Sequence, residues 1–184
     1  MSGEAGAGWT PARGARMEIV LGLGGNLGDP PAVFARVLER LDAEHEVIAA
    51  SSLYRSRPVG PPQAEFWNMA ARVGTPATPL DLLRMCGELE AAAGRRREGA
   101  IRWGPRCLDI DLLIAAVLVH RGPLLELPHR ELHRRAFALV PAAEIAPDWV
   151  HPYLGLTLAR LAESVLRSDP GAVRRVTGVP PERT

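Results

Sequence analysis

Hydrophobic residues recur along the chain at two spacings. Apolar residues that alternate with polar ones or form short runs predict strands, whereas apolar residues three and four positions apart predict amphipathic helices. Strands are expected at 17–23, within 45–57, and at 66–73, 108–119 and 124–127. Helices are expected at 31–44, at 80–94 behind a cap at Thr75 or Thr78, at 137–145 interrupted by Pro141, and from about 156 onward.

The order of these elements predicts an α+β fold, a mainly antiparallel sheet with helices packed on it. Two strand–helix–strand units come first, and a hairpin with its turn at 120–123 and trailing helices follow. No linker divides the chain, so we expect one domain over 17–167. Residues 1–16 are rich in glycine and alanine and lack periodicity, which predicts a disordered extension. Residues 168–184 are expected to form a polar tail.

Composition excludes several classes of protein. Of the 184 residues, 47% are hydrophobic and 23% charged, which is ordinary for a globular domain. The net charge of +1 gives no overall field that would favour nucleic acid or a membrane surface. All 22 basic residues are arginine, so any phosphate site must be built from guanidinium groups.

Cellular location is expected to be cytoplasmic. No apolar run reaches the roughly 18–20 residues of a membrane span, and no secretory signal precedes the first strand. Cys86 and Cys107 form neither a disulfide framework nor a zinc spacing. We expect both to be reduced residues in apolar surroundings.

A pair of carboxylates marks the segment with the most chemical content. Asp109 and Asp111 lie two residues apart in an apolar strand, so both should project from one face, about 6–7 Å apart. Such like charges repel unless a cation lies between them, and magnesium favours carboxylate and phosphate oxygens. Arg106 and Trp103 directly precede the pair, which indicates a site for a polyphosphate and a planar ring. For the Asp-x-Asp pattern alone, solvated charges at a strand end are the more common explanation.

Other motifs leave alternatives open. The glycine-rich turn at 24–30 is either a tight strand-to-helix connection or a place where backbone approaches a ligand. Asn68, inside an apolar strand, is either a structural bridge or a reader of a heterocycle edge. The basic loop at 95–99 is either solvated or binds phosphate. His129 and His133 have zinc-like spacing but no third ligand nearby, which favours an anion-binding or structural role.

Five stretches together resemble one family. They are Gly24–Asp29; Ser51-Ser52-x-Tyr54 with Pro58–Pro61 and Phe66-x-Asn68; Arg102–Leu113; Pro128-His129 with Arg135-Ala136-Phe137; and Glu144–Pro147. Over about residues 17–165 the chain resembles the 6-hydroxymethyl-7,8-dihydropterin pyrophosphokinases of folate biosynthesis. The resemblance implies a ferredoxin-like α+β sandwich and transfer of pyrophosphate from ATP to the hydroxymethyl group of the dihydropterin, with release of AMP.

The resemblance also implies roles on the ATP side. Asp109 and Asp111 would hold two magnesium ions and act in catalysis together with Arg97 and Arg106. The residues implied in binding ATP are Glu90, Arg95, Arg97, Trp103, Arg106, Leu112, His129 and Arg135. The loop at 95–99 is one residue longer than in familiar bacterial members, so Arg96 and Arg97 both remain candidates for the phosphate contact. By its pattern alone, Glu90 is expected to be a surface charge.

On the pterin side, the resemblance implies that Asn68 and the backbone near Ser56, Arg57 and Val59 read the hydrogen-bonding edge. Phe66 and Phe137 would line or stack on the ring, and Trp103 would cover it. The chain departs from the family at Arg57, where a proline is usual. It also departs at Gly87 and Leu124, on the adenine side.

Two other functions compete with this one. A non-catalytic ferredoxin-like module could bind RNA or another protein, but aromatic residues make up only 5% of the chain and its net charge is small. A diverged enzyme could act on another alcohol or be inactive, against which both aspartates and Asn68 argue. We therefore expect a monomer that binds the small molecules ATP and the dihydropterin, and neither nucleic acid nor a membrane.

Overall fold

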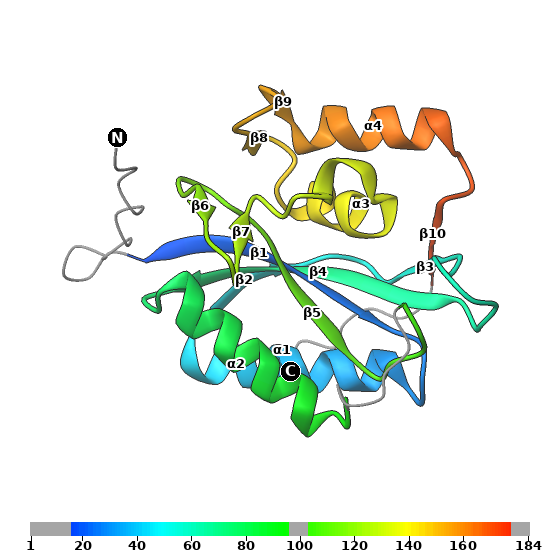
Figure 1. The fold of residues 1–184 in the computed structure, drawn as a ribbon, viewed down its shortest axis with the longest axis horizontal. Helices are drawn as coiled ribbons and strands as arrows, with labels where there is room; N and C mark the ends of the chain where they lie inside the picture. The colour runs from blue at the N-terminus through cyan, green and yellow to red at the C-terminus, as the bar shows by residue number, and fades with distance from the viewer. Residues whose placement is uncertain (1–15, 96–102, 178–184) are drawn as a thin grey trace.

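A six-stranded antiparallel sheet forms the centre of the molecule (Figure 1). The computed structural model describes residues 16–95 and 103–177. Strands follow one another in the sheet as β10-β3-β4-β1-β5, and β2 pairs with β4 beside β3. Their bounds are β1 Met17–Gly25, β2 Glu46–Ala50, β3 Tyr54–Ser56, β4 Phe66–Thr75, β5 Asp109–Ala115 and β10 Val173–Arg175. The α+β fold with a mainly antiparallel sheet is confirmed.

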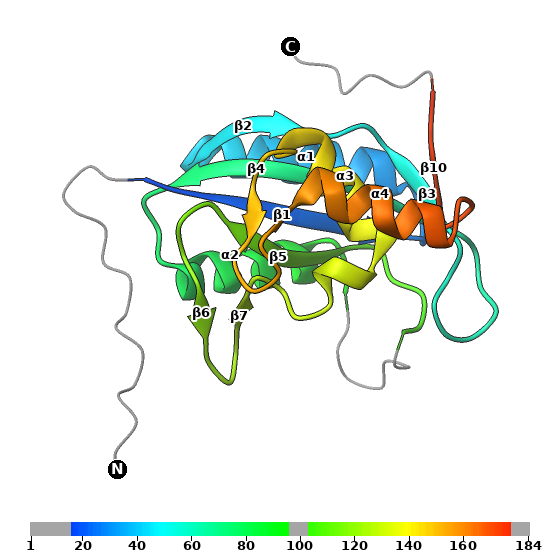
Figure 2. The same ribbon diagram turned by 90° about the horizontal axis from the view of Figure 1, so that it is seen from above.

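Helices cover both faces of this sheet. On one face lie α1 (Pro30–Glu44) and α2 (Pro79–Ala92), and on the other lies α3 (Ala136–Ile145) with α4 (Leu158–Ser168) packed outside it (Figures 1 and 2). Alternation along the strands supplies both cores. Ile19 and Leu21 are buried towards α1 and α2, whereas Val20 is buried towards α3 and α4. No helix in the described part of the chain is both long and apolar enough to cross a membrane.

Local capping explains where two helices begin. The Asp29 carboxylate accepts a hydrogen bond from Ala32 N, and Pro30 occupies the first turn of α1. Of the two expected caps for α2, Thr78 is the one used, since its hydroxyl accepts a hydrogen bond from Asp81 N at 3.2 Å. Thr75 instead accepts a hydrogen bond from Ala77 N.

Three expected boundaries were wrong. Strand β5 ends at Ala115, paired with Ile19 of β1, rather than near 119. The hairpin is formed by β6 (His120–Arg121) and β7 (Glu126–Leu127), so its first strand includes residues expected in the turn. Helix α3 continues through Pro141, whose ring is buried.

The segment expected to be a polar tail contributes the outermost strand of the sheet. Strand β10 follows α4 and pairs antiparallel with β3. A second short hairpin, β8 (Val150–His151) with β9 (Leu156–Thr157), precedes α4. A three-residue strand with two arginines carries too little periodicity to be found from sequence.

Candidate active site

A cavity of about 370 Å³ opens on the α3 face of the sheet. Its walls come from the ends of β1, β4 and β5, from β3 and the loop after it, and from the segment that joins the 3₁₀ helix η1 (Leu132–Arg134) to α3. Eleven of the sequence-predicted site residues line it, namely Ser56, Arg57, Val59, Phe66, Asn68, Trp103, Arg106, Asp109, Asp111, Arg135 and Phe137. The expected phosphate and pterin residues therefore share one cavity.

The two carboxylates of β5 face this cavity, as the strand alternation predicted, but their environments differ. Asp109 accepts hydrogen bonds from Arg95 Nη1 at 2.5 Å and Arg106 Nη1 at 2.6 Å. Asp111 has no hydrogen bond or ion pair with any residue that the structure describes. Burial, and then the negative charge of Asp109, raises the pKa of Asp111 above its usual range. Asp111 thus lacks the direct ion pairs that Asp109 has.

Two glycines of β1 leave room in front of these carboxylates. Gly22 pairs with Asp111 and Gly24 with Asp109 in the β1–β5 register, and both glycines line the cavity. A Cβ added to Gly22 would lie 3.0 Å from Leu113 Cδ1, which is too close for an unadjusted contact. The absence of side chains here keeps the floor of the cavity open.

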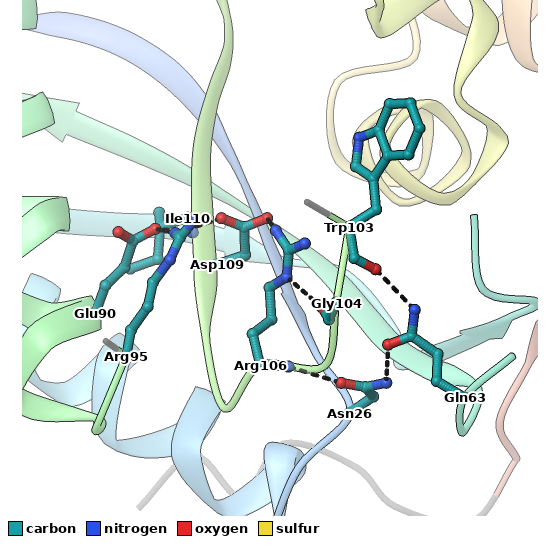
Figure 3. A network of polar contacts seen from close by, with 9 residues as sticks. All are labelled: Asn26, Gln63, Glu90, Arg95, Trp103, Gly104, Arg106, Asp109 and Ile110. Carbon is teal, nitrogen blue, oxygen red and sulfur yellow. Dashed lines mark hydrogen bonds and ion pairs between the residues drawn. The ribbon is translucent and has the colours of Figure 1, made fainter. Parts of the chain in front are cut away.

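Glu90 is a buried residue and not the surface charge that its pattern predicted. Its side chain accepts a hydrogen bond from Ile110 N at 2.8 Å and forms an ion pair with Arg95 (Figure 3). Only 3% of the residue is exposed. Arg95 thus lies between the carboxylates of Glu90 and Asp109, and α2 is tied to the start of β5 through it.

Three loops are joined by amide side chains beside the carboxylates (Figure 3). Asn26 Oδ1 accepts a hydrogen bond from Arg106 N at 2.9 Å, and Asn26 Nδ2 donates to Gln63 Oε1 at 3.1 Å. Gln63 Nε2 in turn donates to the carbonyl oxygen of Trp103 at 2.7 Å. Asn26 and Gln63 therefore link the backbone that carries Arg106 to the backbone that carries Trp103. Sequence reasoning assigned neither of them a role.

Trp103 has a constrained backbone at the edge of the cavity. Its φ is +59°, in the left-handed region that side chains other than glycine rarely adopt. It lies against Gly60, where an added Cβ would be 2.9 Å from Trp103 Cβ. The residue is 46% exposed, and so it can cover a ligand without first leaving a buried position.

Asn68 lines the cavity from β4, and hydrogen bonds from its amide nitrogen fix the orientation of its side chain. Nδ2 donates to Ser56 Oγ at 3.0 Å and to the Phe66 carbonyl at 3.3 Å. Asn68 Oδ1 has no hydrogen bond to any described residue, although the side chain is buried. An acceptor is thus presented to the cavity beside the rings of Phe66 and Phe137. This geometry is compatible with both roles considered for Asn68, a structural hydrogen-bonded bridge and a group that recognises the edge of a heterocycle.

The segment around η1 adds positive charge and one neutral histidine. Arg135 lines the cavity, and its positive charge partly offsets the effect of burial and of Asp109 on the pKa of Asp111. His129 Nδ1 is 3.1 Å from Glu131 N and accepts its hydrogen bond, so the neutral ring carries its proton on Nε2. Burial lowers the pKa of His129, which favours this neutral form. Glu131 and Arg134 also line the cavity and were missed from sequence.

Not all expected residues reach the cavity. Leu112 is buried in the core beside α1 and α2, because alternation turns it away from Asp111. Its implied role in ATP binding stays a prediction, and the side chain itself does not line the cavity. Glu90, Arg95 and His129 are not among the residues that line it. Arg96 and Arg97 lie outside the described residues. Within the described ranges, no group of three His, Cys, Asp or Glu side chains could hold a metal ion.

Comparisons with known proteins agree on one family. The sequence profile described as 7,8-dihydro-6-hydroxymethylpterin-pyrophosphokinase matches residues 20–147. The chain is 43% identical over 159 residues to the 2-amino-4-hydroxy-6-hydroxymethyldihydropteridine pyrophosphokinase of Methylorubrum extorquens, covering 85% of this chain and 96% of that protein. The protein of that name from Pseudomonas aeruginosa is 38% identical over 134 residues, covering 71% and 82%.

Solved structures show the same fold at low sequence identity. The crystal structure of Plasmodium falciparum HPPK-DHPS with pteroate matches with a TM-score of 0.68 and 13% identity, covering 87% of this chain. A second HPPK-DHPS structure, in complex with substrates, has a TM-score of 0.67 and 12% identity. The chain spans about half the length of these proteins, 48% and 46% respectively. The ferredoxin-like α+β fold is thereby confirmed.

Proposed function

The chain belongs to the 7,8-dihydro-6-hydroxymethylpterin-pyrophosphokinase family, and we propose from this premise how its cavity carries out the family's reaction. The protein is an ATP-dependent pyrophosphokinase that transfers the pyrophosphoryl group of ATP to hydroxymethyldihydropterin in folate biosynthesis. The observation that supports this assignment of the cavity is its division. Asp109 and Asp111 line it from β5, the carboxylate end, and Asn68 and Phe66 line it from β4, the amide end, with β1 between the two strands.

Magnesium fits the carboxylate end. Asp109 and Asp111 supply the hard oxygen donors that Mg²⁺ prefers, and the Asp111 carboxylate faces the cavity without a direct ion pair to any described residue. Mg²⁺ is commonly held by one or two carboxylates together with substrate phosphates and water, so two side chains suffice. Two ions would neutralise phosphate charge and hold the transferred group in line with the hydroxyl. The number of ions is part of our proposal.

Arg95 and Arg106 are proposed to exchange partners when ATP binds. In the structure both guanidinium groups are bound to Asp109. If that carboxylate held a metal ion, the same N–H groups would be available for phosphate oxygens, which guanidinium groups match in geometry. Arg135, which has no ion pair among the described residues, adds a third positive charge. Phosphoryl-type transfer depends mainly on such alignment and charge neutralisation.

The pterin is proposed to bind at the amide end. Asn68 Oδ1 would accept a hydrogen bond from an N–H group of the ring, and its orientation is set by the bonds that Nδ2 makes to Ser56 and Phe66. Phe66 and Phe137 would contact the ring faces, each worth about 0.5–1.5 kcal/mol beyond area burial. Trp103 would cover the ring and exclude water from the transferred group.

His129 is proposed to donate a hydrogen bond to phosphate from Nε2. Its Nδ1 is occupied by Glu131 N–H, and its lowered pKa keeps the ring neutral near pH 7. His129 would therefore donate this hydrogen bond while its ring stays neutral.

Turnover tests this proposal directly. Purified protein should form AMP from ATP only when both Mg²⁺ and 6-hydroxymethyl-7,8-dihydropterin are present. Omission of the pterin, or chelation of the metal by EDTA, should reduce AMP to background. If no AMP forms with all components present, the proposed function is refuted and a non-catalytic binding module becomes the favoured alternative. The expected monomer and the cytoplasmic location remain proposals, the first testable by light scattering.

A further inference from the structure

Strand β10 lies beyond the residues that the family profile matches, yet it pairs with a strand of the cavity wall. The profile ends at residue 147, and β10 is Val173–Arg175. Its register places Val173 opposite Ser56, and Val176 N donates to the Leu53 carbonyl at 2.8 Å. Figures 1 and 2 both show β10 beside β3, at the outer edge of the sheet.

The strand that β10 covers carries a cavity residue at its end. Strand β3 has three residues, and its other neighbour, β4, pairs Ser56 with Phe66 and Tyr54 with Asn68. Without β10, β3 would be a three-residue edge strand with unpaired backbone groups towards solvent. Ser56 Oγ is the atom that accepts the hydrogen bond from Asn68 Nδ2, so a shift of β3 is transmitted directly to the amide.

Side chains tie the same segment to other parts of the wall. The Asp169 carboxylate accepts a hydrogen bond from Arg57 Nη2 at 2.6 Å, and Arg57 lines the cavity. Its second oxygen accepts from Gly171 N at 3.2 Å, which shapes the turn between α4 and β10. Arg174 pairs with Glu65, in the loop that precedes Phe66, at 3.0 Å.

A further ion pair ties β10 to the helix on the other side of the cavity. Arg175 donates to Ser52 Oγ at 2.8 Å and to Glu144 at 3.3 Å. Glu144 lies in α3, the helix that also carries Phe137. The contacts of residues 169–176 thus reach Arg57, which lines the cavity, and α3, which carries Phe137. None of those described touches the carboxylates of β5.

We propose that β10 and Asp169 position β3 and Arg57, the part of the cavity wall assigned to the pterin, an inference that rests on the proposed function. They hold β3 and Arg57 against the cavity and act on the dihydropterin through Ser56, Asn68 and Arg57. Because ATP is assigned to the carboxylate end, loss of these elements should weaken pterin binding selectively.

Two truncated chains test the strand. A chain ending at Ser168 lacks β10, whereas a matched chain ending at Thr177 keeps it. We expect the KM for 6-hydroxymethyl-7,8-dihydropterin to rise about tenfold or more in the first chain, with less than a twofold change in the KM for ATP. The second chain should match the full-length protein. Equal KM values for the pterin in both chains, or equal losses for both substrates, would overturn the proposal.

Asp169→Ala tests the positioning contact without removing the strand, and decides the matter if the chain ending at Ser168 does not fold. Since the ion pair with Arg57 is exposed, we expect a two- to fivefold rise in the KM for the pterin with kcat unchanged. Asp169→Glu should restore the KM. Glu163→Ala removes an exposed ion pair with Arg160 on α4 and should change nothing.

A wild-type KM in Asp169→Ala, or a fall in kcat instead, would contradict this role. Failure of the proposed function has a different signature, because the full-length protein itself would then form no AMP.

Discussion

The two carboxylates of β5 differ in what surrounds them, although they lie on one face two residues apart. Asp109 is held by two arginines, whereas Asp111 is half of a like-charged pair and has no direct ion pair among the described residues. A buried anion without a direct ion pair destabilises the folded protein. Asp111 is therefore better explained by a ligand that binds it than by the fold.

Substitution should separate these two roles. Asp111→Asn removes a buried charge without changing size, so we expect the free energy of unfolding to rise by about 1 kcal/mol while turnover is lost. Asp109→Asn leaves Arg95 and Arg106 without their carboxylate and should destabilise by about 1–2 kcal/mol. Urea unfolding without metal or ATP measures both. Greater destabilisation by Asp111→Asn than by Asp109→Asn would contradict the assignment.

Buried His151 should make stability depend on pH. Its ring packs edge-on against His133 and Tyr153, and its Nδ1 has no hydrogen-bond partner in the described chain. Burial, and then the charge of His133, lowers the pKa of His151 below 6.5 in the folded state. As pH falls, His151 therefore takes up its proton at a higher pH in the unfolded chain than in the folded protein. The contribution of His151 to stability is thus lost as pH falls below about 6.5.

Thermal unfolding between pH 7.5 and 5.5 checks this prediction. Each kcal/mol lost lowers Tm by roughly 2–4 °C in a protein of this size. His45 and His129 also have lowered pKa values and contribute in the same direction. His151→Phe should therefore reduce the fall in Tm without abolishing it. An unchanged pH dependence in this variant would show that His151 does not titrate on unfolding.

Residue positions on strands could be predicted better than residue environments. The period of two placed Asp109 and Asp111 together from sequence alone, and the same period could have shown that Leu112 points away. Glu90 could not be found in this way. Its partner Arg95 and the backbone of Ile110 come from other elements, so its burial depends on tertiary packing that no local pattern records.

At the scale of elements, loops rather than strands complete the candidate site. The turns after β1 and before β4, and the segment that enters β5, are joined through Asn26 and Gln63. These bonds fix the backbone of Trp103 relative to Arg106 without closing the cavity. Such links between loops position the lining residues, but the residues that make them show no periodic spacing in the sequence from which they could be predicted.

Gln63→Leu should uncouple Trp103 from this network. The bond from Gln63 to the Trp103 carbonyl is exposed, so we expect stability to change by no more than about 1 kcal/mol. Turnover, measured as kcat/KM for the pterin, should fall several-fold because Trp103 is less well placed. Gln63→Glu keeps an acceptor for Asn26 but lacks the donor, and should show a similar loss. Wild-type kcat/KM values for the pterin in both variants would show that this contact does not position Trp103 for turnover.

Elements with strong periods were predicted, and short ones were not. The expected strands within 17–23 and 66–73 and the helices at 31–44 and 80–94 are confirmed with small shifts. Strand β10 was missed because a Val-Arg-Arg segment has no apolar alternation. It is a strand because β3 offers a free edge more than 100 residues earlier in the chain, as the pairing of Val173 with Ser56 shows.

At the scale of the whole molecule, one sheet brings distant segments into a single cavity. Strand β1 pairs with β4 on one side and with β5 on the other, so the turn after β1 and the segment that enters β5 meet at one end of the sheet. There the Asn26 and Leu27 N–H groups both donate to the Arg106 carbonyl. The order of strands could not be read from sequence periods, and the resemblance to a family was needed to expect it.

We propose that this cavity moves a pyrophosphoryl group as one unit, with Asp111 as an essential group. ATP labelled with ³²P at the β-phosphate tests it most directly, with Mg²⁺ and 6-hydroxymethyl-7,8-dihydropterin present. In the wild-type protein we predict that the label appears in the pterin product, and that Asp111→Asn, still folded, transfers none. Label found in ADP, or transfer by Asp111→Asn at the wild-type rate, would contradict the account.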